Sequence, residues 1–454
     1  MTNTLNPKLS EPMFSTRQIF SLLIPVFFDA VLFMIVGIVD SVMVASAGSE
    51  AVSAVSLMDT ISSFFLLVQN SLAAGGGIVV AQYIGKRDYE NARCAAKQTV
   101  YVSTLYTTAI MVLLLVFLSP MIKLVYGDLE PTLLSNCESY LFWILLGFPV
   151  YAIGNSCATM LRAQANTKLA LYIAGTVNIL NAIGNAILIY GFDMGVSGAA
   201  ISTSFSRLVY CVLGILTLKN REAPVFLENL RKIRFKKDML KKVLRIGVGN
   251  GIEGGLTQLG SILLSMMLSS LGAASVAVYS IACKLCSIGW ALLSALDVVL
   301  MTVAGQCIGA GEREQAKMYV KKFMRYAAIA VMGFFSFILL FRNYAVLIYD
   351  LDENMLAECA KQMAYAAIIT MLTFYARAVI PFAAFRAAGD TRYSVISGIT
   401  GMFAGRVLFG YIFAIVLDMG VLGMWIGMGM NHLICALSAH IRLKNGRWLE
   451  KKVI

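Results

Sequence analysis

Charged side chains and histidine are scarce in this sequence. Asp, Glu, Lys and Arg make up 14% of the 454 residues, whereas hydrophobic residues make up 59%. Soluble domains carry about 25% charged residues, so this composition excludes an ordinary water-soluble domain. The chain has two histidines, and we find no His-rich metal set, no serine–histidine arrangement and no paired-aspartate motif. The sequence therefore does not predict an enzyme.

Cysteine provides no framework for a metal or redox site either. The nine cysteines are scattered, and one CxxC pair, Cys283 and Cys286, has no second pair and no histidine nearby. We interpret this pair as packing residues. Cys137 and Cys359 fall near the outer membrane face at related positions of the two halves of the chain. Two unpaired cysteines are the preferred interpretation there, and a disulfide is the alternative.

Apolar stretches long enough to cross a bilayer follow one another along the chain. A hydrocarbon core about 30 Å thick requires about 20 apolar residues per helix. Lipid permits only helices or closed barrels to span it, and alternating strands are absent from the sequence. We therefore predict an all-α polytopic membrane protein with spans at 17–46, 53–82, 97–119, 136–160, 169–190, 196–218, 243–270, 276–308, 322–348, 362–385, 393–416 and 421–441.

The net charge of +12 raises the question of a nucleic-acid partner, but the placement of the basic residues argues against one. If the N-terminus is cytoplasmic, most Lys and Arg residues fall on the cytoplasmic side, and the opposite loops hold Lys123, Arg342 and Lys361. The positive-inside rule then places both termini and the long central connection in the cytoplasm. The membrane that we expect is the plasma (bacterial inner) membrane. Residues 1–16, with Lys8 as their basic residue, do not resemble a cleaved signal.

The sequence contains an internal repeat, displaced by 224 or 225 residues, that covers all six spans of each half. It predicts an N-terminal lobe (1–218), a cytoplasmic interlobe connection (219–242), a C-terminal lobe (243–441) and a cytoplasmic tail (442–454). Because each half has an even number of spans, both halves enter the membrane in the same direction, as suits alternating access. The matching segments are 81–92 with 305–316, 161–167 with 385–391, and 193–198 with 418–423.

Several short segments carry a family resemblance. Pro25 precedes Asp40 of Gly37-Ile-Val-Asp-Ser-Val-Met43 by fifteen residues, and Ala81-Gln-Tyr-Ile-Gly85, Leu161-Arg-Ala163 and Gly198-Ala-Ala-Ile-Ser-Thr203 follow. In this order, and duplicated, they resemble the multidrug and toxic compound extrusion (MATE) transporters over essentially the whole chain. The resemblance implies two pseudo-symmetric six-helix lobes around a central cavity. It also implies a monomer without a cofactor that exports amphiphilic or cationic compounds in exchange for Na⁺ or H⁺.

Ionisable residues within the predicted spans are candidates for function, because each costs about 2.5 to 3.5 kcal/mol on insertion scales. The first lobe holds Asp29, Asp40, Asp59 and Arg207. Asp29 and Asp40 are eleven residues apart, so they return to nearly the same helix face, about 16 Å apart along the axis. The excess of acidic residues makes this lobe the expected place for a cation.

Asn181 and Asn185, four residues apart, must point the same way from the fifth span. By the family resemblance, these two residues match the coupling-cation site together with Asp40 and Thr203, while Pro25 matches a bend in the first helix. One carboxylate with amide and hydroxyl oxygens can replace the hydration shell of Na⁺, and a buried aspartate can also take up a proton. The alternative is that the asparagines bond neighbouring helices.

The second lobe differs in its charges. By the repeat, Glu253 corresponds to Asp29 and Arg406 to Asn181, while the counterpart of Asp40 is Leu264 or Ser265. A complete second cation site is therefore not predicted. Glu253 either attracts a cationic substrate or pairs with an arginine. The residues predicted for a substrate cavity or second-lobe polar site are Glu253, Gln258, Asp29 and Arg406.

Two functions remain open from the sequence. The first is an antiporter that exports amphiphilic or cationic small molecules. The alternative is a lipid-linked oligosaccharide flippase of the same superfamily, which needs a cationic cavity for pyrophosphate and for which Arg207, Lys284, Arg377 and Arg406 are candidates. The expected partners are a small-molecule substrate and membrane lipids.

Overall fold

The computed structural model describes residues 11–228, 234–349, 351–451 and 454. The first ten residues, including Lys8, and residues 229–233 of the predicted interlobe connection lie outside the described residues. All regular elements in the described ranges are helices. They are α1 (Thr16–Ala45), α2 (Ser49–Gly85), α3 (Tyr89–Val116), α4 (Leu118–Tyr126), α5 (Pro131–Leu146), α6 (Phe148–Ala163), α7 (Thr167–Asn185), η1 (Ala186–Gly191), α8 (Gly195–Thr217), α9 (Lys237–Ser270), α10 (Ala273–Gly309), α11 (Arg313–Ala345), η2 (Val346–Ile348), α12 (Glu353–Leu372), α13 (Tyr375–Ala387), α14 (Thr391–Thr400), η3 (Gly401–Leu408), α15 (Phe409–Tyr411), η4 (Ile412–Val416), α16 (Val421–Asn445) and η5 (Arg447–Glu450).

The prediction of twelve spans is confirmed. Among the described residues, nine helices are long and apolar enough to cross a membrane, and two bent pairs, α5 with α6 and α12 with α13, meet the same criterion when each pair is taken as one span. The twelfth is α9, which has 34 residues but is less apolar because it carries Asn250, Glu253 and Gln258. The short helix α4 was not expected from the sequence.

Two predicted spans, 136–160 and 362–385, are broken rather than continuous. The bend between α5 and α6 is 46°, and the bend between α12 and α13 is 58°. In the first pair Pro149, at the start of α6, lacks the N–H that would continue the helix from α5. In the second, Phe374 adopts a left-handed backbone conformation with φ of 53°. The breaks occupy related places in the two lobes.

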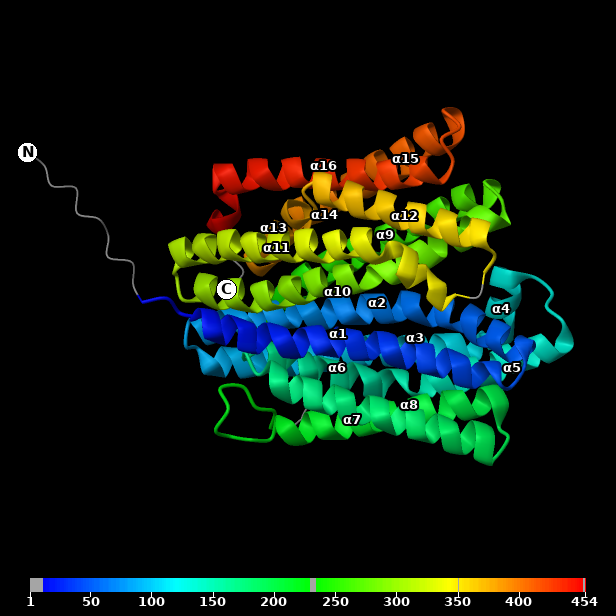
Figure 1. Ribbon diagram of the computed structural model, residues 1–454. Helices are drawn as coiled ribbons and strands as arrows, with labels where there is room; N and C mark the ends of the chain where they lie inside the picture. Colours follow the sequence, from blue (N-terminus) through cyan, green and yellow to red (C-terminus); the bar gives the residue numbers. More distant parts are fainter. Residues whose placement is uncertain (1–10, 229–233, 350, 452–453) are drawn as a thin grey trace, which may run out of the picture.

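The helices lie alongside one another as two halves (Figure 1). Helices α1 to α8 form the N-terminal lobe and α9 to α16 the C-terminal lobe, and both ends of the described chain lie at the same end of the bundle. The lobes meet where α2 packs against α9 and α10. A Cβ added to Gly75 would lie 2.5 Å from the backbone nitrogen of Gly247, so α2 and α9 touch through their backbones.

The first helix connects the two lobes. Its start is held by the C-terminal lobe, because the Phe14 amide donates to the Tyr319 hydroxyl at 2.7 Å and that hydroxyl donates back to the Phe14 carbonyl at 2.8 Å. Ile19 and Val26 join the apolar core of the C-terminal lobe. The helix also packs against α7 of its own lobe. Pro25 is buried within α1, which continues through it.

Candidate ion and substrate sites

A polar cluster in the N-terminal lobe joins α1, α7 and α8. Asn185, the last residue of α7, donates from Nδ2 to Oδ1 of Asp40 at 2.7 Å. One turn earlier, Nδ2 of Asn181 lies 3.3 Å from the hydroxyls of both Ser202 and Thr203 on α8. The structure therefore brings Asp40, Asn181, Asn185 and Thr203 into one region. Ser202, which sequence reasoning missed, also donates to the Asn181 carbonyl at 2.9 Å.

One side-chain oxygen of this cluster, Oδ1 of Asn185, makes no hydrogen bond among the described residues. Asn185 is 1% exposed, so this oxygen is buried. A buried polar atom without a partner costs about 1 to 3 kcal/mol. An oxygen of this kind beside a carboxylate fits a bound cation, because carboxylate, amide and hydroxyl oxygens are the ligands that hard cations take.

A second acidic residue lies close to this cluster. Asp59 on α2 accepts a hydrogen bond from the Tyr140 hydroxyl at 2.8 Å. Arg207 donates to the Ile144 carbonyl at 3.0 Å, and its guanidinium lies 5.4 Å from the Tyr151 ring centroid. Asp59 and Arg207 are thus satisfied by an aromatic hydroxyl, a ring face and a backbone carbonyl, and Tyr140 and Tyr151 were not singled out from the sequence.

A central cavity of about 980 Å³ lies between the lobes. It receives side chains from α1, α2, α6 and α8 on one side and from α9, α10 and α13 on the other. Glu253 and Gln258, both predicted for the substrate cavity, line it. Its charged lining residues are three acids and two arginines, which leave one excess negative charge: Asp59, Glu253, Asp297, Arg207 and Arg386.

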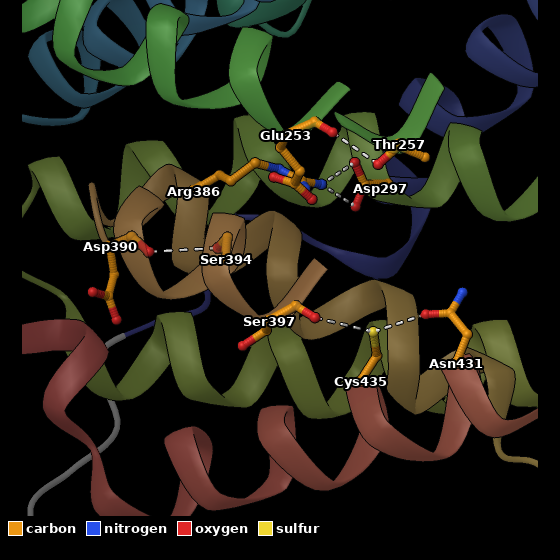
Figure 2. A network of polar contacts seen from close by, with 9 residues as sticks. All are labelled: Glu253, Thr257, Asp297, Arg386, Asp390, Ser394, Ser397, Asn431 and Cys435. Atoms are coloured by element: carbon orange, nitrogen blue, oxygen red, sulfur yellow. Dashed lines mark hydrogen bonds and ion pairs between the residues drawn. The ribbon is translucent and has the colours of Figure 1, made fainter. Parts of the chain in front are cut away.

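The C-terminal side of this cavity carries a carboxylate–arginine triad (Figure 2). Nη2 of Arg386 donates to both oxygens of Asp297, at 2.9 and 3.0 Å, while Nη1 lies 3.9 Å from Glu253. Glu253 therefore does pair with an arginine, as one of the two alternatives stated. The pair is long, at 3.9 Å, because Arg386 lies closer to Asp297. Sequence reasoning did not place Asp297 or Arg386 in the site. The repeated Arg-Ala segments at 162 and 386 were the signal that could have identified Arg386, and the position of Asp297 within the predicted span 276–308 was the signal for that acid.

Asp29 requires a correction. It shares a helix with Asp40, but it forms an ion pair with Arg162 of α6 at 2.7 Å and lines neither the central cavity nor the cluster around Asp40. Arg162 itself lines a smaller cavity of about 310 Å³ that shares Tyr151 with the central one. Asp29 with Arg162 is the repeat counterpart of Glu253 with Arg386. The N-terminal pair is neutral, whereas the C-terminal triad carries an excess negative charge.

Arg406 lies apart from the central cavity. It lines a separate pocket inside the C-terminal lobe, together with Tyr375 and His432. It therefore fits the prediction of a second-lobe polar site rather than that of a substrate-cavity residue. Cys137 and Cys359 are both buried and free.

The lobes close against each other at the end of the bundle where both chain ends lie. Gln82 on α2 donates to the Ala387 carbonyl of the C-terminal lobe at 2.5 Å. Gln306 on α10 donates to the Ala163 carbonyl of the N-terminal lobe at 2.8 Å. The repeat relates the two glutamines and the two alanines, so the contact is reciprocal.

Two repeated helical lobes around a shared polar cavity, closed at one end, define a multi-pass membrane transporter rather than an enzyme. Comparison with known proteins identifies which kind. The MatE family model matches residues 25–187 and 252–412, and the chain therefore belongs to the MatE family. The resemblance predicted from the sequence is confirmed.

Similar proteins cover nearly the whole chain. The uncharacterized transporter YisQ of Bacillus subtilis is 22% identical, covering 98% of this chain and 97% of its own length. The probable multidrug resistance protein NorM of Thermotoga maritima is 24% identical, with 96% and 94% covered. A solved outward-facing multidrug resistance MATE family transporter of the MOP superfamily aligns with a TM-score of 0.88 at 21% identity, covering 95% and 96%.

Proposed function

We propose that this protein is a secondary active antiporter that exports amphiphilic or cationic small molecules in exchange for Na⁺ or H⁺. The observation that carries the proposal is the contact between Asp40 and Asn185, which leaves a buried amide oxygen without a partner beside an intramembrane carboxylate. A transporter that couples to a cation needs such an incompletely satisfied group, because a fully bonded carboxylate gains nothing from ion or proton binding.

The coupling site consists of Asp40, Asn181, Asn185 and Thr203. Asp40 supplies the negative charge, and Asn185 supplies the neutral amide oxygen beside it. One turn away, the Asn181 amide contacts the Thr203 hydroxyl, which adds a further neutral oxygen to the cluster. A cation bound here draws α1 toward α7 and α8. Protonation of Asp40 removes its charge and weakens its hold on the Asn185 amide, so either ion changes how α1 packs.

Pro25 marks the position at which α1 can bend when the contact at Asp40 changes. The proline ring removes one backbone hydrogen bond of the helix and makes a bend there less costly. Below Pro25 the helix is held by the C-terminal lobe through Phe14, and above it Asp40 contacts the N-terminal lobe. An altered contact at Asp40 is therefore transmitted as a bend at Pro25 that changes the cavity between the lobes.

The charge of the central cavity favours a cationic substrate. Three acids and two arginines line it, among apolar side chains such as Phe33, Leu66 and Met301. Apolar walls with a small number of charged groups are typical of pockets for amphiphilic ligands. The name of the Thermotoga maritima relative, a probable multidrug resistance protein, agrees with this substrate class. The flippase alternative requires an excess of positive charge in the cavity and is less well supported.

The orientation follows from the positive-inside rule, which places the closed end, with Gln82 and Gln306, in the cytoplasm. The cavity then faces outward in this conformation, and the protein acts as a monomer in the plasma membrane. In such a state, substrate leaves toward the outside, and the coupling ion enters from there.

The test is reconstitution in liposomes and measurement of efflux of a fluorescent cationic dye under an imposed Na⁺ or H⁺ gradient. Asp40→Asn is expected to abolish gradient-driven efflux while the purified protein keeps its elution profile and Tm. Asp128→Asn, a change of an exposed acid between α4 and α5, serves as the matched control and should retain efflux. Retained efflux in Asp40→Asn would contradict the proposed mechanism, and defective envelope polymer without any change in drug export on gene deletion would favour the flippase.

A further inference from the structure

The C-terminal lobe contains a polar pocket that the proposed export mechanism does not use. Its volume is about 330 Å³, and its walls come from α10, α13, η3 and α16. Among its lining residues, Arg406 is the one that carries a full charge. The others are Trp290, Tyr375, Ala378, Val379, Met428, Asn431, His432 and Cys435.

Arg406 has no counter-ion in the described part of the chain. Its Nε is buried without a hydrogen-bond partner, and Nη2 makes one long contact, 3.4 Å, with the Tyr279 hydroxyl. The ion pairs of this lobe's spans join Arg386 to Asp297 and Glu253 and leave Arg406 out. A guanidinium within a membrane-spanning segment is costly unless an anion pairs with it or water solvates it. A bound anion in this pocket would therefore lower the free energy of the folded protein.

Two neighbouring side chains, Asn431 and Tyr375, have donors that no other group among the described residues uses. The Thr373 hydroxyl donates to the Ile369 carbonyl and so accepts from Nδ1 of His432 at 2.9 Å, and the His432 ring packs on Tyr375 with 4.4 Å between centroids. Oδ1 of Asn431 accepts from the Cys435 thiol at 3.4 Å, which leaves the amide nitrogen available, as Figure 2 shows. The Tyr375 hydroxyl also makes no hydrogen bond within the described residues.

The repeat shows that this pocket reverses the polarity of the coupling site. Arg406 stands where the N-terminal lobe has Asn181, and Leu264 or Ser265 stands where it has Asp40. The C-terminal lobe thus has a guanidinium and no carboxylate at the positions related to these two residues. Arg406 also lies within η3, a π-helical segment, and such distortions of a helix are often found at functional sites.

We propose that this pocket binds a monovalent anion, either an inorganic anion such as chloride or the carboxylate group of a small molecule. Arg406 provides the charge, and Asn431 and Tyr375 provide neutral donors. The proposal goes beyond the export function and does not depend on it, because an anion site in the C-terminal lobe is compatible with any coupling ion at Asp40.

The test uses the purified full-length protein in neutral detergent at constant Na⁺ and ionic strength. Sodium lactobionate, whose anion is too bulky for the pocket, is replaced stepwise by sodium chloride or sodium acetate, and the Tm is followed. We expect a saturable rise in Tm for the wild type, because a ligand that binds only the folded state stabilises it. Arg406→Gln should weaken the anion dependence by about tenfold or more, and Lys284→Gln, at an exposed lysine of the same lobe, should leave it unchanged.

A second measurement keeps the proposal testable if Arg406→Gln does not fold. Because Trp290 lines the pocket, anion binding should change tryptophan fluorescence in the wild type and in Arg406→Lys but not in Trp290→Phe. A response to chloride alone assigns the pocket to an inorganic anion, and a response to acetate assigns it to a carboxylate. A wild-type protein that responds to neither anion, or an Arg406→Gln variant that responds like the wild type, would overturn the proposal.

Discussion

Gln82 and Gln306 hold the two lobes together by equivalent hydrogen bonds, each donated to a backbone carbonyl of the opposite lobe. The sequence repeat relates these two glutamines, so the two hydrogen bonds are equivalent by the pseudo-symmetry that relates the lobes. Such a contact is well suited to a reversible seal, since both bonds break when the lobes separate at this end and both form again when they meet.

The seal requires close backbone approach at two glycines. A Cβ on Gly85 would lie 1.9 Å from the Gln306 carbonyl oxygen, and a Cβ on Gly309 would lie 1.9 Å from that of Gln82. Gly85→Ala is therefore expected to prevent full closure and to reduce dye efflux severalfold. Spin labels on the α2–α3 and α10–α11 connections should report a longer distance in this variant. Gly175→Ala, at an open position of α7, should behave like the wild type in both measurements.

The carboxylate–arginine triad predicts a non-additive stability effect. Removing the charge of Arg386 leaves Asp297 and Glu253 facing each other without compensation, which for a buried pair costs about 3 to 5 kcal/mol. Arg386→Gln should accordingly lower the Tm strongly. The double variant Arg386→Gln with Asp297→Asn should recover much of that loss in the same thermal unfolding experiment. Equal destabilisation by the single and double variants would show that the charge balance is unimportant.

At the proposed coupling site, Asn185→Asp adds a second carboxylate beside Asp40. The two acids are held near each other by α1 and α7, so a cation between them is bound more tightly and a shared proton is taken up more readily. Na⁺ titration by isothermal calorimetry should show about tenfold tighter binding if Na⁺ is the coupling ion, since a full charge is added within contact distance. Asn185→Ala, which removes the amide, should weaken binding instead, and unchanged affinity in both variants would place the ion elsewhere.

The start of α3 predicts a pH-dependent contribution to stability. Asp88 accepts hydrogen bonds from the backbone and side-chain amides of Asn91, at 3.2 and 2.9 Å, and these bonds hold the pKa of its carboxyl below the ordinary value of 3.8. Stability from this cap is therefore present above pH about 4 and is lost as the pH falls through the lower, folded-state pKa. Asp88→Ala should lower the Tm by a small amount at pH 7, and the difference from the wild type should shrink as the pH falls below about 4. A difference that persists there would mean that packing rather than charge is responsible.

Much of the fold could be predicted because its signals are local. Apolar stretches of sufficient length mark the spans, and the two copies of the Arg-Ala segment at 162 and 386 mark the repeat. The breaks at Gly147 and Phe374 were not predicted, since a bent span and a straight one have the same overall composition. In the site, Asp40 could be singled out by its charge, whereas Ser202 and Tyr140 could not, because hydroxyls are common in membrane helices.

The sequence by itself determined the membrane environment, the number of spans and the division into two related lobes, because hydrophobic length and self-similarity are properties of the linear chain. Only the tertiary structure decided which charges meet. Asp29 and Asp40 share a face of one helix, yet Asp29 pairs with Arg162 and Asp40 contacts Asn185. Those partners come from α6 and α7, and which of them each acid reaches depends on how the helices cross.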